Sequence, residues 1–291
     1  MPQPLTPDTL IYSFTLAGDP HISPDGTRIL YSLSQTIRDT KKPTSNLWLC
    51  AVDGSNPLQF THSTGRNGNG RWSPDGAQIA FVSDRVKKSG IFVLPAVTPG
   101  EAREITHHNA SISDLAWSPD CARLAYTVPF DPANPDEMEP PEGAAPRVRV
   151  TSRIDYKQDN RGYLGDTRLQ VFVADVATGE RRRVTREAVD YTTPQWSPDG
   201  AWLAAQVPNR NGMHSQLALI EVATGETRLI GPEDGAVGAW SWSPIGDRIL
   251  FAGDTSQTWQ LDLFLYDIAS GEVRRLTDDL QCAPDTGYVS V

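Results

Sequence analysis

Side chains capable of nucleophilic chemistry are abundant in this chain, but none stands in a catalytic pattern. The sequence has many Ser and Asp residues and five His, yet a Ser-His-Asp triad is recognised by geometry and not by residue types. A nucleophilic serine on a strained strand-to-helix elbow follows the pattern Gly-x-Ser-x-Gly, and the 291 residues contain no such pattern. We therefore predict that this chain contributes no catalytic residue.

Two other chemical patterns are also weak. A glycosidase needs two carboxylates facing one cleft, about 5–9.5 Å apart. The segments that enter the repeated turns described below offer only Asp19 and Asp114 for that role. The adjacent His107 and His108 would point to opposite faces of a strand, so they would rarely share one metal ion. The sequence predicts no metal site and no cofactor.

The best candidates for a binding surface lie in an insertion over residues 129–165. Its first half, residues 131–143, has five acidic residues, four prolines and no Lys or Arg, a composition that cannot build a core. Its second half alternates like a strand and leads into a turn. Loops on rigid scaffolds often carry binding, so we expect Arg153, Tyr156 and Tyr163 to contact a peptide or a partner domain. The alternative, an elaborated edge strand with exposed polar residues, stays open.

The elements that would position these residues are set by a repeat. A turn of the type Ser-Pro-Asp-Gly, preceded by an aromatic or apolar residue and followed by an apolar strand, occurs five times. Its members are Ser23, Pro24, Asp25 and Gly26; Trp72, Asp75 and Gly76; Trp117 and Asp120; Trp196, Asp199 and Gly200; Trp242 and Gly246. From serine to serine the steps are 50, 45, 79 and 46 residues. Periods of about 40–50 residues with short strands are typical of β-propellers.

The repeat therefore predicts an all-β chain, a β-propeller of five four-stranded repeats in one domain over residues 1–291. The approximate repeat boundaries are 18–66, 67–111, 112–190, 191–236 and 237–280. We interpret the tryptophans as packing between sheets and the aspartates as turn caps. Cys121 in place of Gly and Ile245 in place of Asp should weaken their turns. Residues 11–14 are predicted as a short helix or a strand.

Composition limits the classes of function. A net charge of −10 and a pI near 5.0 argue against nucleic-acid binding, which needs a basic face. Three cysteines without metal-like spacing fit a reducing compartment. The first residues lack the pattern of a signal peptide, and no apolar run approaches the ~18 residues of a membrane span. We expect a cytoplasmic protein with no membrane partner.

Several of these segments resemble a known family. Residues 18–26 (Gly-Asp-Pro-His-Ile-Ser-Pro-Asp-Gly), 47–49 (Leu-Trp-Leu), 72–85 and 153–163 resemble the propeller of the prolyl oligopeptidase family of serine peptidases, in its acylaminoacyl-peptidase branch. The Ser-Pro-Asp-Gly turns alone are shared with TolB-type and other WD40-like propellers. The resemblance implies a seven-bladed propeller that covers an α/β-hydrolase domain and admits only short peptides to its catalytic serine.

The resemblance leads to two hypotheses of function. In the first, this chain is an incomplete, open part of such a propeller, packs on a hydrolase domain in cis and gates the entry of peptide substrates. Residues 281–291 would then begin a further repeat. In the second, it is a stand-alone propeller scaffold that binds a protein or a ligand. A closed ring would leave no free sheet edges, whereas an open arc would tend to associate.

Overall fold

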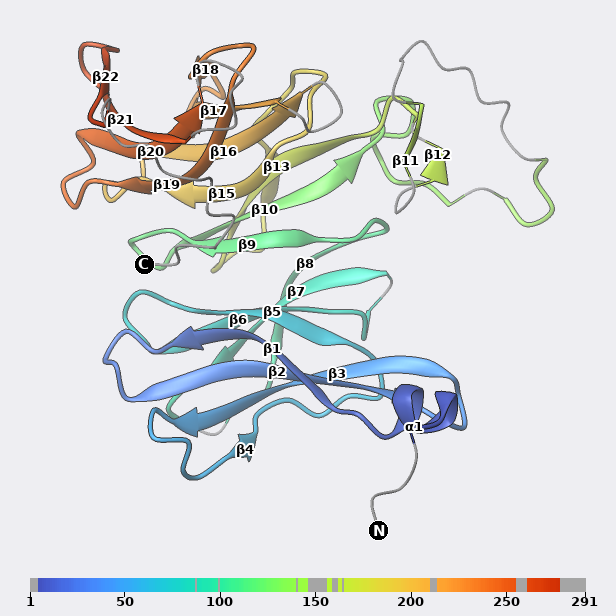
Figure 1. Ribbon diagram of the computed structural model, residues 1–291. Helices are drawn as coiled ribbons and strands as arrows, with labels where there is room; N and C mark the ends of the chain where they lie inside the picture. The colour runs from blue at the N-terminus through green and yellow to red at the C-terminus, as the bar shows by residue number, and fades with distance from the viewer. Residues whose placement is uncertain are drawn as a thin grey trace. The chain divides into compact units, whose positions relative to one another are not determined.

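Almost all regular secondary structure in the described residues is β-strand. The computed structural model describes residues 5–86, 88–98, 100–139, 141–145, 156–158, 162–163, 165–209, 214–254 and 261–277. These residues form one short helix, α1 (Pro7–Tyr12), five four-stranded antiparallel sheets and a two-stranded hairpin (Figure 1). The predicted all-β fold with five four-stranded repeats is confirmed. Cys282 and residues 281–291 lie outside the described residues.

Four of the five sheets are formed by strands that are consecutive in sequence. The first contains β1 (Leu16–Ile22), β2 (Arg28–Ile37), β3 (Lys42–Ala51) and β4 (Leu58–Gln59). The second contains β5 (Asn67–Trp72), β6 (Gln78–Ser83), β7 (Ser89–Pro95) and β8 (Arg103–His108). The third contains β9 (Ser113–Trp117), β10 (Arg123–Phe130), β13 (Arg168–Asp175) and β14 (Arg181–Arg183). The fourth contains β15 (Thr192–Trp196), β16 (Trp202–Asn209), β17 (His214–Glu221) and β18 (Thr227–Ile230). The fifth contains β19 (Ala236–Trp242), β20 (Arg248–Asp254), β21 (Asp262–Asp267) and β22 (Val273–Arg275).

The insertion lies between the second and third strands of the third sheet. It carries its own hairpin, β11 (Lys157–Gln158) and β12 (Gly162–Tyr163), which pairs with none of the five sheets. The chain divides into two compact units, residues 1–128 with 173–181 and residues 129–172 with 182–291.

The middle strands of the second, third and fourth sheets are apolar runs because they are buried on both faces, whereas those of the fifth sheet alternate between buried and exposed residues. Ile79, Ala80 and Phe81 of β6 are fully buried, as are the four residues 217–220 of β17. In the first unit, Ile79 and Phe81 join Leu30, Leu47 and other residues of the first sheet in one core. In the second unit, a similar core joins the fourth and fifth sheets. Continuous apolar runs, rather than alternating ones, are expected for strands covered on both sides.

Each repeated turn is organised by a serine hydroxyl, and in the first four turns that serine is buried. In the second sheet the Ser73 hydroxyl donates to Asp75 at 2.5 Å and accepts from the backbone N–H of Gln78 at 2.9 Å. Asp75 in turn accepts from the N–H of Ala77 at 3.0 Å. The turns that begin at Ser23, Ser118 and Ser197 repeat the same three contacts. The hydroxyl therefore joins the first and second strands of its sheet through a side chain.

The fifth turn lacks the aspartate but keeps the acceptor. Ile245 occupies the aspartate position and is 79% exposed. The Ser243 hydroxyl donates instead to Asp247 at 2.6 Å and still accepts from the N–H of Arg248 at 3.1 Å. The expectation that Ile245 weakens this turn stays a prediction, although the central hydrogen bonds of the turn are kept. Cys121 does adopt the strained conformation expected of it, with φ of 58° at a position where the other turns have glycine.

Tryptophans before the turns connect neighbouring sheets by hydrogen bonds. The indole N–H of Trp72 donates to the carbonyl of His21 at 3.2 Å, and that of Trp117 to the carbonyl of Arg71 at 3.0 Å. In the second unit, Trp242 donates to the carbonyl of Gln195 at 3.4 Å. Each acceptor belongs to the first strand of the preceding sheet. Trp72, Trp117 and Trp196 are at most 9% exposed, so none of the three lies on an open surface.

The first strands contain a repeated irregularity that the sequence analysis did not predict. Four residues before the turn serine, φ is positive at Asp19 (51°), Asn69 (53°), Asp114 (51°) and Thr193 (50°). The strand register shifts beside each of these residues. Asp and Asn tolerate this conformation, whereas the β-branched Thr193, which also precedes a proline, is strained by about 1–3 kcal/mol.

We expect loss of one turn hydroxyl to destabilise the chain. Ser73 is 1% exposed, so Ser73→Ala leaves the Gln78 N–H and the Asp75 carboxylate without their shared partner. The free energy of unfolding should fall by about 1–3 kcal/mol, measured by urea denaturation. The control is Ser111→Ala at an exposed serine, which should leave stability unchanged. Equal midpoints for the two variants would contradict the role given to the hydroxyl.

The turn carboxylates also predict a loss of stability in acid. Hydrogen bonds from the Ser23 hydroxyl, then from the backbone and side chain of Thr27, lower the pKa of Asp25 to about 2 from an ordinary 3.8. The stabilisation is therefore fully present above about pH 4 and is lost as the pH falls through about 2. Asp25→Asn should flatten the fall in unfolding midpoint between pH 5 and pH 2.5, whereas Asp136→Asn, at an exposed aspartate, should not. Parallel pH profiles for wild type and Asp25→Asn would rule out this contribution.

Candidate functional site

The structure brings together two of the three predicted binding residues. Tyr156 and Tyr163 lie at the hairpin of β11 and β12, with ring centroids 6.4 Å apart and ring planes at 29°. Their side chains are 50% and 60% exposed. Arg153 lies outside the described residues. A role for these residues in binding stays a prediction.

The first strands of the first unit carry a charged cluster. Arg71 of β5 lies 2.9 Å from one oxygen of Asp19, and His21 Nε2 lies 2.9 Å from the other. Burial opposes ionisation of Asp19, but the hydrogen bonds and charges of His21 and Arg71 outweigh it and lower the pKa of this carboxyl. Asp114 on β9 instead accepts from the Thr127 hydroxyl at 2.8 Å. The side chains of Asp19, His21 and Arg71 pair with one another and connect β1 to β5. They therefore have the character of a structural ion pair.

The two adjacent histidines lie in different environments, as expected from strand geometry. His107 pairs with Glu104 at 2.7 Å and is partly exposed. His108 is 1% exposed and contacts the Tyr126 hydroxyl at 3.2 Å. Among the described residues no group of three or more His, Cys, Asp or Glu is arranged to hold a metal ion.

A further candidate surface lies at helix α1. The Thr6 side chain caps the helix by accepting from the N–H of Thr9 at 3.1 Å, and Pro7 and Asp8 occupy its first turn. Arg38, from the chain between β2 and β3, pairs with Asp8 at 2.6 Å and stacks 4.6 Å from the ring of Tyr12. One arginine thus contacts the helix through both Asp8 and Tyr12. A six-residue helix is too short to be stable in isolation.

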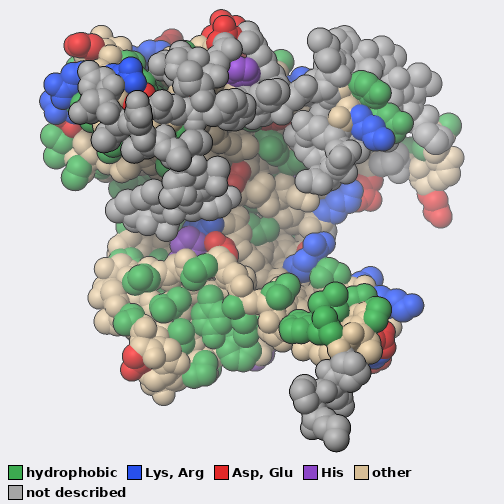
Figure 2. Space-filling view, viewed as in Figure 1, with side chains coloured by type: hydrophobic (Ala, Val, Ile, Leu, Met, Phe, Trp, Pro, Cys, Tyr) green, Lys and Arg blue, Asp and Glu red, His purple; other side chains and the backbone are tan. Residues whose placement is uncertain are grey.

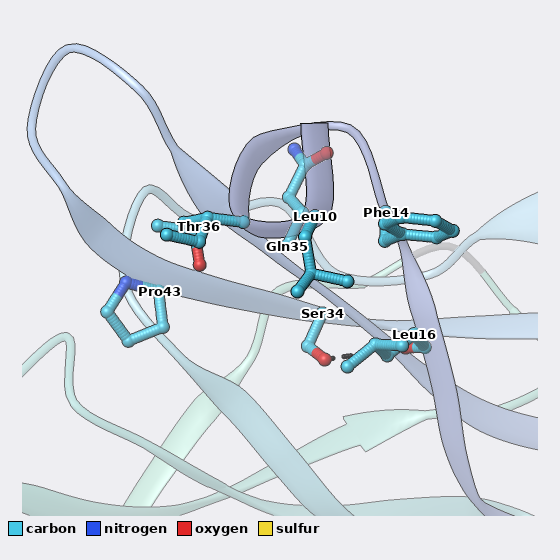
Figure 3. A pocket seen from close by; sticks show the side chains of 8 residues that line it. Leu10, Phe14, Leu16, Ser34, Gln35, Thr36 and Pro43 are labelled. Atoms are coloured by element: carbon cyan, nitrogen blue, oxygen red, sulfur yellow. Dashed lines mark hydrogen bonds between the residues drawn. The ribbon is translucent and has the colours of Figure 1, made fainter. Parts of the chain in front are cut away.

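The apolar side chains around α1 are exposed and surround a pocket. We define the α1 surface as Leu10, Ile11, Phe14 and Leu16, which are 57%, 50%, 46% and 65% exposed. No residue of α1 is buried. Apolar side chains gather over α1 and the adjacent end of β1 (Figure 2). Together with Ser34, Gln35, Thr36 and Pro43 they line an open pocket of about 450 Å³ (Figure 3).

The α1 surface was not predicted from the sequence. Residues 1–10 contain three prolines and read as a polar lead-in, while residues 11–14 were compatible with a helix or a strand. The structure resolves this choice, since α1 ends at Tyr12 and β1 begins at Leu16. The signal available in the sequence was the cap Thr-Pro-Asp before an apolar pair, which marks a helix start.

Comparison with known proteins defines the class of this chain. Residues 10–131 match the family model of the TolB β-propeller domain. The chain also resembles a putative TolB from Agrobacterium tumefaciens, with a TM-score of 0.56 and 20% identity over 90% of this chain and 80% of that one. The fold is thus that of a TolB-type β-propeller.

The particular relationship is to peptidases. Over 196 residues the chain is 30% identical to the uncharacterized peptidase YuxL of Bacillus subtilis, covering 67% of this chain but 29% of that protein. An acylaminoacyl peptidase in complex with Z-Gly-Gly-Phe-chloromethyl ketone matches 94% of this chain and 41% of its own, with a TM-score of 0.70 and 18% identity. The predicted resemblance to the propeller part of such peptidases is confirmed. The chain spans well under half the length of these peptidases.

Within the described residues, no helix has the length and apolar character needed to cross a membrane.

The α1 surface should bind an apolar dye. A variant with Leu10→Ser, Ile11→Ser and Phe14→Ser removes three exposed apolar groups, so the fluorescence of bound anilinonaphthalene sulfonate should fall severalfold. Because none of the three is buried, the melting temperature should change little. The matched control is Leu229→Ser, at a leucine that is 54% exposed on another sheet. Equal dye binding by both variants would show that the α1 surface is not the accessible apolar site.

Proposed function

We propose that this chain is the propeller portion of a serine peptidase of the prolyl oligopeptidase type. In this role it packs against a catalytic hydrolase domain and limits access to short peptides, and it works in the cytoplasm. The observation that carries the proposal is the relationship to peptidase YuxL at 30% identity over two thirds of this chain. The fold likeness to acylaminoacyl peptidase supports it.

The α1 surface supports a packing role. Burying a leucine, isoleucine or phenylalanine side chain stabilises a complex by about 1.5–3 kcal/mol. The four side chains of the α1 surface are between 46% and 65% exposed, so a partner could bury them. Arg38 contacts the helix at Asp8 and Tyr12, which favours this position of the helix. A pre-positioned apolar surface binds with a smaller loss of conformational entropy.

The absence of a nucleophile elbow from this chain is consistent with a catalytic serine that is supplied by another domain. The pattern Gly-x-Ser-x-Gly does not occur in the 291 residues, so the catalytic serine would come from the hydrolase domain. We expect a fluorophosphonate probe to label no serine of the purified chain stoichiometrically, under conditions in which a serine peptidase is labelled completely. Stoichiometric labelling of one serine would contradict this assignment.

The gene offers a second test of the proposal. Continuation of the reading frame beyond codon 291 into a segment with Gly-x-Ser-x-Gly is expected. A stop codon at that point, with no hydrolase domain encoded nearby to associate with the chain, would contradict the proposal.

A second candidate function is a stand-alone scaffold for binding a protein or ligand. It is favoured by one observation, the coverage of 80% of the putative TolB chain. The two candidates differ in the behaviour of the chain by itself. A scaffold should be monomeric and fully folded alone, whereas a propeller portion with uncovered apolar surfaces should associate as its concentration rises. Sedimentation velocity over a hundredfold range of concentration distinguishes them.

A further inference from the structure

Two asparagine–glycine pairs follow one another in β5. They are Asn67-Gly68 and Asn69-Gly70, and a third pair, Asn211-Gly212, lies outside the described residues. Asparagine before glycine is especially open to deamidation, because a glycine has no Cβ to keep its backbone nitrogen away from the asparagine side chain. The sequence of β5 therefore contains two candidate modification sites of similar intrinsic chemistry.

Asn67 is held by hydrogen bonds at both ends of its side-chain amide. The residue is fully buried. Its amide nitrogen donates to Asn46 Oδ1 at 2.9 Å, and its amide oxygen accepts from the Arg85 guanidinium at 2.9 Å. The Ser45 hydroxyl also donates to the Asn67 carbonyl at 2.9 Å. The amide of Asn67 therefore cannot turn towards the Gly68 nitrogen without losing its partners.

Asn69 lacks this protection. The residue is partly exposed, and among the residues that the structure describes its side-chain amide has no hydrogen-bond partner. The strand register also skips it, since Gly68 lies opposite Val82 and Arg71 lies opposite Ala80, with the irregularity between them. The second pair is thus held less firmly than the first, although the two are adjacent in one strand.

The fold itself favours a reactive pair at residues 69 and 70. The backbone of Asn69 is left-handed, with φ of 53°, a conformation that Asn, Asp and Gly tolerate best. A Cβ at position 70 would lie 2.9 Å from Leu30 Cδ2 and 3.1 Å from Leu47 Cδ2, and both leucines are almost fully buried. Packing therefore requires Gly70, and the backbone at position 69 restricts the residue before it.

The neighbouring sheets show which product position 69 accepts. Asp19 of β1 and Asp114 of β9 occupy the equivalent place, four residues before the turn serine, and each has φ of 51°. The Arg71 guanidinium lies 2.8 Å from the Gly70 carbonyl and 2.9 Å from Asp19, so a cation is already present two residues after Asn69. An aspartate at position 69 is compatible with this fold.

We propose that Asn69 is a site of spontaneous deamidation in the folded chain, whereas Asn67 is protected. The Gly70 backbone nitrogen attacks Cγ of Asn69. The N–Cγ bond forms, the Cγ–Nδ2 bond breaks, and ammonia leaves with the proton of the Gly70 amide. Water then opens the cyclic imide at either carbonyl and gives aspartate or isoaspartate. The net reaction consumes water, releases ammonia and adds a negative charge to β5, with no oxidation or reduction.

The experiment compares the two asparagines within one peptide. The folded chain is incubated at mildly alkaline pH, well below its melting temperature, and is then digested with trypsin. Cleavage after Arg66 and Arg71 releases both pairs together, so fragment ions in tandem mass spectrometry assign the mass gain to one asparagine or the other. We expect Asn69 to react at least about tenfold faster than Asn67, because only Asn67 must first break two hydrogen bonds.

The unfolded chain is the internal control. In guanidinium chloride the hydrogen bonds of Asn67 are lost, so the two asparagines should react at rates within about threefold of each other. The variant Asn69→Gly keeps a residue that tolerates the left-handed backbone. It should abolish the fast reaction in this peptide and leave Asn67 unmodified. Asn69→Asp, which is the product itself, should keep the melting temperature of the wild type.

Three outcomes would overturn the proposal. Equal rates at Asn67 and Asn69 in the folded chain would show that the reaction passes through the unfolded state. An unmodified Asn69 in the folded chain, while the unfolded chain reacts, would show that β5 protects both pairs. An Asn69→Asp variant that does not fold would show that the position excludes the product. The reaction needs no hydrolase domain, so none of these results bears on the labelling and reading-frame tests of the proposed function.

Discussion

A buried indole is stabilised by a hydrogen-bond acceptor, and at Trp72 and Trp117 the neighbouring sheet supplies that acceptor. The first strand of each sheet is an edge strand, so half of its backbone groups have no strand to pair with. Exposed edges invite unwanted pairing. Trp72 and Trp117 each donate to a carbonyl on the first strand of the preceding sheet, which satisfies the indole and occupies part of that edge. One side chain therefore fixes the spacing of two sheets and protects a strand.

Much of the fold could be predicted from the sequence because each repeat contains its own turn motif. The spacing of the serines identified five sheets, and the runs of apolar residues identified their buried middle strands. The positive φ at Asp19, Asn69, Asp114 and Thr193 did not follow, since the residue types vary and nothing local requires a left-handed backbone at Thr193. The replacement of the missing aspartate by Asp247 was likewise unpredictable. It depends on where a carboxylate two residues away comes to lie once the turn has formed.

The candidate sites were predictable to different extents. Tyr156 and Tyr163 stood out because they interrupt a regular repeat, and the hairpin that joins them was suggested by the turn between them. Their ring contact depends on strand register, which a segment of two paired residues on each side does not reveal. The α1 surface was missed for another reason. A one-and-a-half-turn helix is too short to display a helical period, and Arg38, which contacts it, lies some thirty residues later in the sequence.

The fifth turn shows how the repeats of a propeller chain can diverge in sequence. Ser243 keeps its carboxylate partner although the usual position holds an isoleucine, so the requirement lies in the acceptor and not in its place along the chain. Copies of a repeat can then diverge in sequence while each still forms the hydrogen bond of its turn. A search that scores the four-residue motif position by position will overlook such copies, whereas one that asks only for a serine followed within four residues by a carboxylate will find them.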